Sequence, residues 1–434
     1  MHQPELETMP VEQLRELQLE RLNGLLGRVY GRVPLYRRKF DEAGVRPHVT
    51  SLADLAELPF TVKDDMRASY PYGMFAVDRR QIVRAHASSG TTGQITVVGY
   101  TRNDISNWAD MMARTLASAG ATADDVVQVG YGYGLFTGGL GAHYGSERLG
   151  CLTIPISGGN TRRQVQVLKD FEVTVLACTP SYSLLIAETA EEMGIDIRSL
   201  PLRLGVFGAE PWSENMRAQI EQRLAIRAID IYGLSEVLGP GVAAECSEQH
   251  GMHVNEDHFL IEILDTETLR PVPDGEYGEV VFTTITKEGI PVVRYRTRDI
   301  SRIIPGDCAC GRTFRRMERI TGRTDDMLII RGVNVFPTQI EQVLAGIPGV
   351  APHYQVILGK HGSMDTVEVH VEVSPDLAFD EIRELEELHR TVRAEIAAAL
   401  AVSIDVRLVE PRSIERSEGK ARRVIDLRSE QEGA

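Results

Sequence analysis

Between about residues 80 and 300, short runs rich in β-branched residues alternate with stretches of helical periodicity. The runs VVQVG (126–130), VTVLAC (173–178) and RLGVFG (203–208) are typical of buried strands. Strands that alternate with helices favour a parallel sheet, because each crossover helix covers one face of it. The sequence therefore predicts an α/β domain with a largely parallel sheet, which an amphipathic helix over residues 11–30 precedes.

The C-terminal quarter has a different pattern. Strand candidates at 366–373 and 403–410 flank a long helix, expected over roughly 379–401. A chain of 434 residues is also too long for one ordinary core. We therefore expect a large domain of residues 1–324 and a small mobile α+β lid of residues 325–434, with the boundary at the GRTDD segment.

The chain is acidic, with 47 Lys and Arg against 62 Asp and Glu and a formal charge of −15. This excess argues against a nucleic-acid partner and against an anionic membrane. The N-terminus lacks the basic start and apolar core of a signal peptide, and no run of about 18 apolar residues predicts a membrane span. Five cysteines do not form a disulfide framework in a chain of this length. We expect a cytoplasmic protein.

The sharpest local signal is a hexapeptide at positions 88–93. It consists of Ser88, Ser89, Gly90, Thr91, Thr92 and Gly93. Two glycines and four hydroxyls make a flexible turn with many donors, which suits a polyphosphate. The Gly-Lys-Ser/Thr ending of a P-loop is absent, and a plain surface turn is the alternative.

Four further segments carry candidate chemistry. Glu236 ends YGLSE after a strand-like run, where a carboxylate could hold Mg2+. Asp299, in YRTRD, could bind ribose hydroxyls. Asp325 lies at the domain boundary, and Lys420 lies in a polar loop near the C-terminus. Taken singly, such a glutamate or lysine is often only solvated.

The order of these segments resembles the adenylate-forming superfamily, and within it the phenylacetate–CoA ligases. The similar stretches are VPLYRRKF (33–40), YGYGLFTGGLGAHYG (131–145), PISGGNTRRQ (155–164), FGAEPW (207–212), DIYGLSEVLGPG (230–241) and MLIIRGVNVFPTQIE (327–341). The resemblance implies a large multi-sheet α/β adenylate-forming domain with a small α+β lid. It also implies ATP, Mg2+ and coenzyme A as cofactors, a small aryl acid as substrate, and a homodimer.

The resemblance also implies residue roles. Ser88 to Gly93 are expected at the β- and γ-phosphates of ATP. Adenine is expected between two segments, with Gly208, Ala209, Glu210 and Pro211 on one side and Asp230, Ile231 and Tyr232 on the other. Asp299 and Arg323 are expected at the ribose or phosphate, and Gly332 along the path of the CoA pantetheine. Glu236 is expected to bind Mg2+, Asp325 to act as the hinge, and Lys420 to reach the carboxylate and α-phosphate. One departure is Gln94-Ile95, where the family commonly has a lysine and a proline; this loss should weaken ATP binding or leave the loop more mobile.

The acid is expected to lie in a flat apolar slot formed in part by Tyr131, Phe136, Gly138 and Ala209. Phenylacetate is the leading candidate, with benzoate, anthranilate or a hydroxylated relative as alternatives, because one methylene discriminates by only about 1–3 kcal/mol. An adenylation enzyme that loads a carrier protein would share the adenylation residues. A non-catalytic relative is disfavoured, because Lys420, Glu236 and Asp299 are all present.

A possible metal site involves Cys246, His253, Cys308 and Cys310. Three cysteines and a histidine match a closed structural zinc site, although the spacing is not that of a zinc finger. His250 could replace His253, and plain buried cysteines are the other alternative. Some phenylacetate–CoA ligases carry a similar cluster. Cys151 and Cys178, in apolar strand contexts, are expected in the core.

Overall fold

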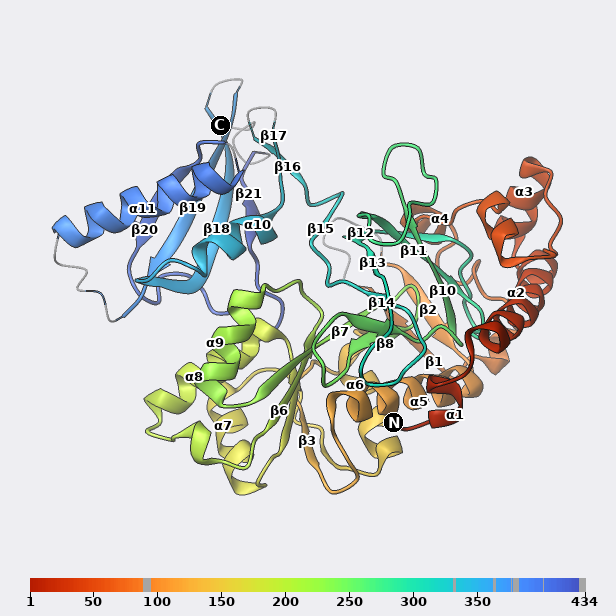
Figure 1. Ribbon diagram of the computed structural model, residues 1–434, viewed down its shortest axis with the longest axis horizontal. Helices are drawn as coiled ribbons and strands as arrows, with labels where there is room; N and C mark the ends of the chain where they lie inside the picture. Colours follow the sequence, from red (N-terminus) through yellow and green to blue (C-terminus); the bar gives the residue numbers. More distant parts are fainter. Residues whose placement is uncertain are drawn as a thin grey trace.

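The computed structural model describes residues 1–88, 95–330, 333–361, 364–375, 377, 382–400 and 402–428. These residues form a large α/β unit and a smaller α+β lid (Figure 1), which confirms the predicted fold class. None of the helices in these ranges is long and apolar enough to cross a membrane.

Helices α1 (Pro4–Glu7), α2 (Val11–Arg32), α3 (Pro34–Ala43) and α4 (Lys63–Ala68) open the chain. Helix α2 covers the predicted amphipathic segment and buries leucines such as Leu22 and Leu26. It ends before Pro34, because a proline disfavours helical backbone in the residue that precedes it. Short 3-10 turns follow at Leu52–Glu57, Arg79–Gln81 and, later in the chain, Ile197–Ser199.

The central sheet has, within the described residues, the order β13-β14-β9-β8-β7-β6-β5-β3-β4. Its parallel half is formed by β3 (Val126–Val129), β4 (Leu152–Ile154), β5 (Val175–Cys178), β6 (Leu204–Gly208) and β7 (Arg227–Leu234). The helices that connect or flank these strands are α5 (Arg102–Ala119), α6 (Gly138–Leu149), α7 (Thr161–Asp170), α8 (Pro180–Glu192) and α9 (Glu214–Leu224). This half matches the parallel sheet that the sequence predicted.

The other half of the sheet is antiparallel. It contains β8 (Gly239–Glu245), β9 (Met252–Val254), β13 (Ile303–Ile304) and β14 (Arg316–Met317). Strand pairing changes from parallel to antiparallel after β7. The connection to β8, residues 235–238, is too short for a crossover helix and long enough only for a hairpin. The change of direction places a turn, rather than a helix, at the end of β7.

A second sheet packs beside the first in one continuous apolar core that also includes α2 and α3. Its antiparallel strands are β10 (Phe259–Leu264), β11 (Gly278–Thr284), β12 (Tyr295–Ser301) and β15 (Gly322–Arg323). A hairpin of β1 (Arg84–Ala87) and β2 (Val97–Tyr100) precedes α5.

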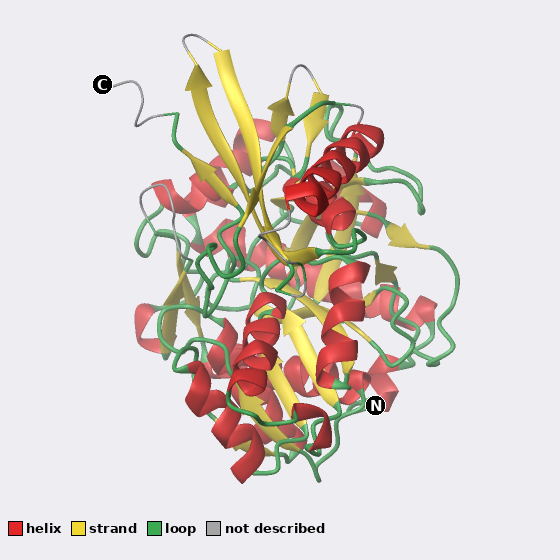
Figure 2. Cartoon of the chain, turned by 90° about the vertical axis from the view of Figure 1, so that its left-hand side faces the viewer, coloured by secondary structure: helices red, strands yellow, loops and turns green. Residues whose placement is uncertain are grey.

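The lid contains β16 (Leu328–Ile330), β17 (Val333–Val335), α10 (Pro337–Leu344), β18 (Val350–His361), β19 (Met364–Val373), α11 (Ile382–Leu400), β20 (Asp405–Val409) and β21 (Val424–Asp426). Strands of its main sheet run in the order β20-β19-β18-β21. It has an apolar core of its own, built from residues between 330 and 406. Figure 2 shows the long lid strands above the helix-covered central sheet.

Candidate active site

The carboxyl ends of β6 and β7 bring together two of the predicted nucleotide segments. Gly208 pairs with Ile231 in the parallel register, so the FGAEP and DIY segments lie side by side. Ligands of parallel α/β sheets bind at this edge. Ala209 adopts a left-handed conformation (φ 73°), and Glu210 turns toward the N-terminus of α8, where one of its oxygens accepts from the amide of Ser181 at 2.8 Å. The sheet register thus brings both segments to the same edge of the sheet, and we call this edge, from Gly208 to Pro211 and from Asp230 to Tyr232, the ledge.

Tyr232, Asp299 and Arg323 form a connected polar chain beside this ledge. The Tyr232 hydroxyl donates to Asp299 Oδ2 at 2.6 Å, and Arg323 Nη1 donates to Asp299 Oδ1 at 2.7 Å. Burial raises the pKa of Asp299, and the charge of Arg323 opposes that effect. Each carboxylate oxygen has two lone pairs, so Asp299 retains acceptor capacity for two hydroxyls. Arg323 also contacts Asp325, at 3.0 and 3.1 Å.

Glu236 lies in the turn after β7 and is only 5% exposed. Its Oε1 lies 3.5 Å from the Lys63 ammonium on α4. A second lysine, Lys287, is fully buried nearby and donates to the Val237 carbonyl at 2.9 Å. Burial lowers the pKa of Lys287 to about 8, against the attraction of Asp104 and Glu236. A buried carboxylate between two lysines is suited to exchange one of these partners for a cation.

Lys420 comes from the lid, and its charge acts on two carboxylates of the site. Burial raises the pKa of both Asp299 and Asp326, and the positive charge of Lys420 opposes the rise in each. The residues on either side of the lysine are anchored to the large unit. Thr179 donates to the Gly419 carbonyl at 3.0 Å, and the Ala421 amide donates to Glu210 Oε2 at 2.8 Å. The structure thus brings the Lys420 loop together with residues about 90 to 240 positions earlier in the sequence.

The phosphate segment can be placed only at its first residue. The amide of Ser88 donates to the Thr96 carbonyl at 3.0 Å, and its hydroxyl is buried without a partner among the described residues. Ser89, Gly90, Thr91, Thr92 and Gly93, and likewise Gln94 and Gly332, lie outside the described residues.

Three of the predicted substrate residues lie close to one another at the start of α6. A Cβ added to Gly138 would lie 2.6 Å from Phe136 Cε1 and 3.5 Å from Tyr131 Cβ, so a larger residue here would displace the Phe136 ring. Tyr131 is buried and its hydroxyl donates to the Val206 carbonyl at 3.3 Å, whereas Phe136 is 37% exposed. Tyr131 is therefore held in the core, whereas the Phe136 ring is accessible to solvent.

The cysteines and histidine of the predicted metal site converge beside β8 and β9. Cys310 Sγ lies 3.3 Å from His253 Nε2, Cys246 Sγ lies 3.7 Å from Cys308 Sγ, and all four ligand atoms lie within 4.8 Å of one another. Two thiolates on a tetrahedral zinc with bonds of about 2.3 Å are about 3.8 Å apart, so the donor set fits this ion. His250 is exposed and is not in the cluster, which favours His253.

The His253 ring is oriented by the backbone. Its Nδ1 lies 3.1 Å from the Phe314 carbonyl, which directs Nε2 toward the sulfurs. Burial lowers the pKa of His253 to about 4, so the ring is neutral and able to act as a ligand. Arg312, next to the cysteine loop, pairs with buried Glu7 of α1 at 2.7 Å. No local sequence signal predicted that the N-terminal segment would cover this loop.

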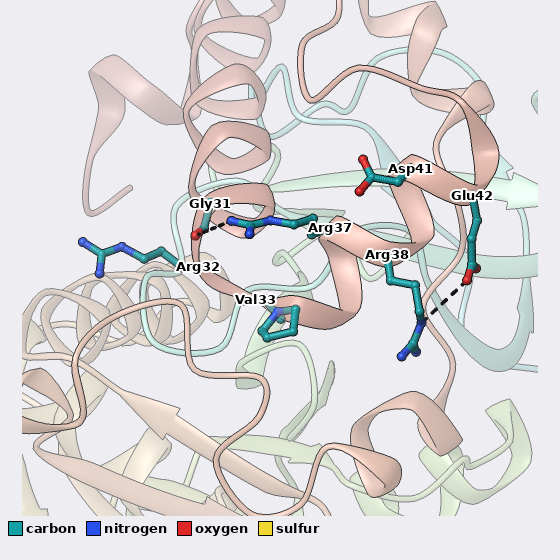
Figure 3. A pocket seen from close by; sticks show the side chains of 8 residues that line it. Gly31, Arg32, Val33, Arg37, Arg38, Asp41 and Glu42 are labelled. Atoms are coloured by element: carbon teal, nitrogen blue, oxygen red, sulfur yellow. Dashed lines mark hydrogen bonds and ion pairs between the residues drawn. The ribbon is translucent and has the colours of Figure 1, made fainter.

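A separate surface hollow of about 500 Å3 lies between α2 and α3 (Figure 3). Its arginines are held locally. Arg37 donates to the Gly31 carbonyl at 3.2 Å, and Arg38 lies 3.9 Å from Glu42. None of the residues that line this hollow is a predicted site residue.

Comparison with known proteins identifies the family. Residues 47–286 match the family model described as AMP-binding enzyme, and residues 332–428 match the AMP-binding enzyme C-terminal domain. The chain is 52% identical to phenylacetate-coenzyme A ligases from Pseudomonas putida and Escherichia coli K12, over 98% of this chain and 96–97% of theirs. The fold and the site define an adenylate-forming AMP-binding enzyme. The chain belongs to the phenylacetate–coenzyme A ligase family.

Solved structures of one relative represent two states of its reaction. A 2-hydroxyisobutyryl-CoA ligase in the postadenylation state with 2-HIB-AMP has 30% identity, a TM-score of 0.93, and coverage of 99% of this chain and 93% of its own. The same enzyme in the thioesterification state, with 2-HIB-AMP and CoA, gives a TM-score of only 0.72 at 99% and 94% coverage. The present structure is therefore more similar to the postadenylation state than to the thioesterification state.

Proposed function

We propose that the protein is an ATP-dependent, AMP-forming aryl acid–CoA ligase, with phenylacetate as its acid. The observation that carries the proposal is that hydrogen bonds to Thr179 and Glu210 hold the lid loop of Lys420 at the edge of the sheet where the two nucleotide segments meet. Family membership at 52% identity supports the choice of acid. ATP and CoA follow from the family.

In the first half-reaction the acid carboxylate attacks the α-phosphate of ATP, pyrophosphate leaves, and an acyl-adenylate forms. Two anions must approach each other, so their repulsion has to be reduced. Lys420 supplies one positive charge at the carboxylate and α-phosphate. Mg2+ held at Glu236 would neutralise phosphate charge, in exchange for the present contact of that carboxylate with Lys63.

The nucleotide is proposed to lie along the ledge between β6 and β7. Gly208 to Pro211 and Asp230 to Tyr232 flank adenine, and Asp299 accepts from the ribose hydroxyls while Arg323 orients its carboxylate. In the second half-reaction the CoA thiol attacks the acyl carbonyl and AMP leaves. The proton of the thiol is released to solvent. Lys420 must leave for this step, which requires the lid to turn.

A panel of acids tests the reaction and the substrate together. We expect CoA-dependent AMP release with no carrier protein present, and a higher kcat/KM for phenylacetate than for benzoate, anthranilate or straight-chain fatty acids. If a ring-substituted benzoate surpassed phenylacetate by tenfold, or about 1.4 kcal/mol, the choice of acid would be wrong and the ligase assignment would stand. AMP release that requires a carrier protein in place of CoA would contradict the ligase assignment.

We further propose that Cys246, His253, Cys308 and Cys310 bind a structural Zn2+. The support is the convergence of four suitable ligand atoms within 4.8 Å and a neutral, backbone-oriented imidazole. A homodimer is proposed from the family resemblance, and sedimentation analysis of the purified protein tests it.

A further inference from the structure

Glu188 of α8 joins the large unit to the lid. Its Oε1 lies 3.1 Å from His353 Nε2 at the start of β18, and its Oε2 lies 3.4 Å from Arg416 Nε in the loop after β20. Arg223 of α9, which belongs to the large unit, lies 3.5 Å from the same carboxylate. Burial alone would raise the pKa of Glu188, but these three partners together lower it to about 2. Glu188 is therefore ionised and receives two side chains that belong to the lid.

Arg416 connects the Glu188 contact to the loop that contains Lys420. Its guanidinium also pairs with Glu372 of β19, at 2.6 and 2.7 Å, and Glu372 is only 1% exposed. Arg416 is thus fixed to the lid core, and Lys420 follows four residues later in the same loop. A shift of Arg416 relative to α8 would move the lysine with it.

Helix α8 holds this loop at two places. Its N-cap residue Thr179 accepts from the Tyr182 amide and donates to the Gly419 carbonyl. Glu188 holds Arg416 more than two turns further along the helix. Figure 1 shows the lid directly above α8 and α9, so one rigid helix gives the Lys420 loop its position.

We propose that Glu188 is a positioning residue for Lys420. The Glu188 contacts stabilise the lid in the adenylation position, and their loss releases the lid for thioester formation. The inference rests on the proposed function. A contact made in only one of two lid positions shifts their populations by the free energy of that contact. The present structure matches the postadenylation state of the relative, with a TM-score of 0.93, better than its thioesterification state, with a TM-score of 0.72.

A neighbouring ion pair between the large unit and the lid is more exposed than the Glu188 contacts. Glu192 on the same helix pairs with Arg412 of the lid, but these side chains are 39% and 63% exposed. Exposed pairs contribute little, because solvent screens them and long side chains lose freedom. The Glu188 carboxylate is 17% exposed and shared by two lid residues, so its contacts are less screened.

The test separates the two half-reactions. In Glu188→Gln, we expect acid-dependent exchange of pyrophosphate into ATP to fall about tenfold, while thioester formation from supplied acyl-adenylate is unchanged or faster. Glu191→Gln is the matched control, because Glu191 lies on the same helix and pairs only with Arg223 among the described residues. This control should behave as wild type in both assays.

A second variant approaches the same contact from the lid. His353→Asn should show the same split, and it decides the question if Glu188→Gln does not fold. Hydrogen exchange of the peptide 416–421 should be faster in both variants, because the Ala421 amide loses its partner when the lid departs. Equal loss in both half-reactions, or no change in either, would overturn the proposal. A wild type that makes no acyl-adenylate would contradict the proposed function instead, and the exchange measurement would still decide the positioning role.

Discussion

At the residue scale, Lys420 is an exposed side chain whose proposed role in charge neutralisation depends on its neighbours. Its charge acts on the carboxylates of Asp299 and Asp326, and hydrogen bonds on both sides hold its loop. An exposed lysine on a held loop can follow a substrate anion without a large cost of desolvation. This combination suits transient charge neutralisation better than permanent structural pairing.

Replacing this lysine should affect one half-reaction. Lys420→Ala is expected to reduce acyl-adenylate formation about a hundredfold or more, because one preorganised charge at the reacting groups is lost. Thioester formation from supplied acyl-adenylate should be nearly normal. Lys169→Ala, on the exposed side of α7, is the control. Equal loss in both half-reactions would refute the role, since Lys420 would then serve the second step too.

Lys287 should make stability depend on pH. Its folded pKa of about 8 lies below the ordinary value of 10.5, so the unfolded chain binds more protons between these values. Its contribution to stability therefore rises as pH increases from 8 to 10.5. Relative to Lys287→Met, wild type should gain about 1–2 kcal/mol in free energy of unfolding between pH 7 and pH 9.5, measured by urea titration. A difference that is the same at both pH values would contradict the assignment.

At the element scale, the cysteine–histidine cluster joins segments that are distant in the sequence. Strands β13 and β14 are two residues each, and the loop between them carries Cys308 and Cys310. A metal ion would link this loop to Cys246, which follows β8, and to His253 of β9. A closed site of this kind contributes folding free energy rather than chemistry.

Metal analysis of protein purified without chelator should find about one zinc per chain. Cys308→Ser should lower the melting temperature by several degrees and leave the rate constant of the remaining folded enzyme largely unchanged, because the site lies in the scaffold. Cys151→Ser, whose thiol is outside the cluster, is the control. Absence of zinc, or an equal effect of both substitutions, would exclude a structural metal here.

At the scale of the whole molecule, one chain must provide two active arrangements. The lid carries its own apolar core and the proposed catalytic lysine, so it can turn as a unit without exposing either core. The segment between β15 and β16 is the proposed pivot, with Asp325 at its centre. Arg323 holds the Asp325 carboxylate in the present position.

A proline at the pivot tests this arrangement. Asp325→Pro should leave adenylation within a few-fold of wild type and reduce thioester formation about tenfold or more, because proline fixes φ and prevents the turn. Asp325→Ala is the matched control, since it removes the same carboxylate and leaves the backbone free. Thioester formation at the wild-type rate in the proline variant would place the hinge elsewhere.

The sequence by itself predicted the α/β alternation, the α+β lid and the members of the candidate sites. These signals are local: strand periodicity, glycine and hydroxyl spacing, and the types of residue that bind phosphate or metal. The lid strand expected at 366–373 is observed at 364–373, and the helix expected over 379–401 at 382–400. Neighbours along the chain suffice for such features.

Only the tertiary structure decided which distant groups meet. It placed His253 rather than His250 beside the cysteines, because β9 pairs with β8 and β14 and the backbone orients the ring. It also showed that Lys287 lies by Glu236 and that Glu188 receives His353 and Arg416. Those contacts depend on sheet order and on the orientation of the lid. Both are set by packing between segments 50 to 230 residues apart, which local periodicity does not encode.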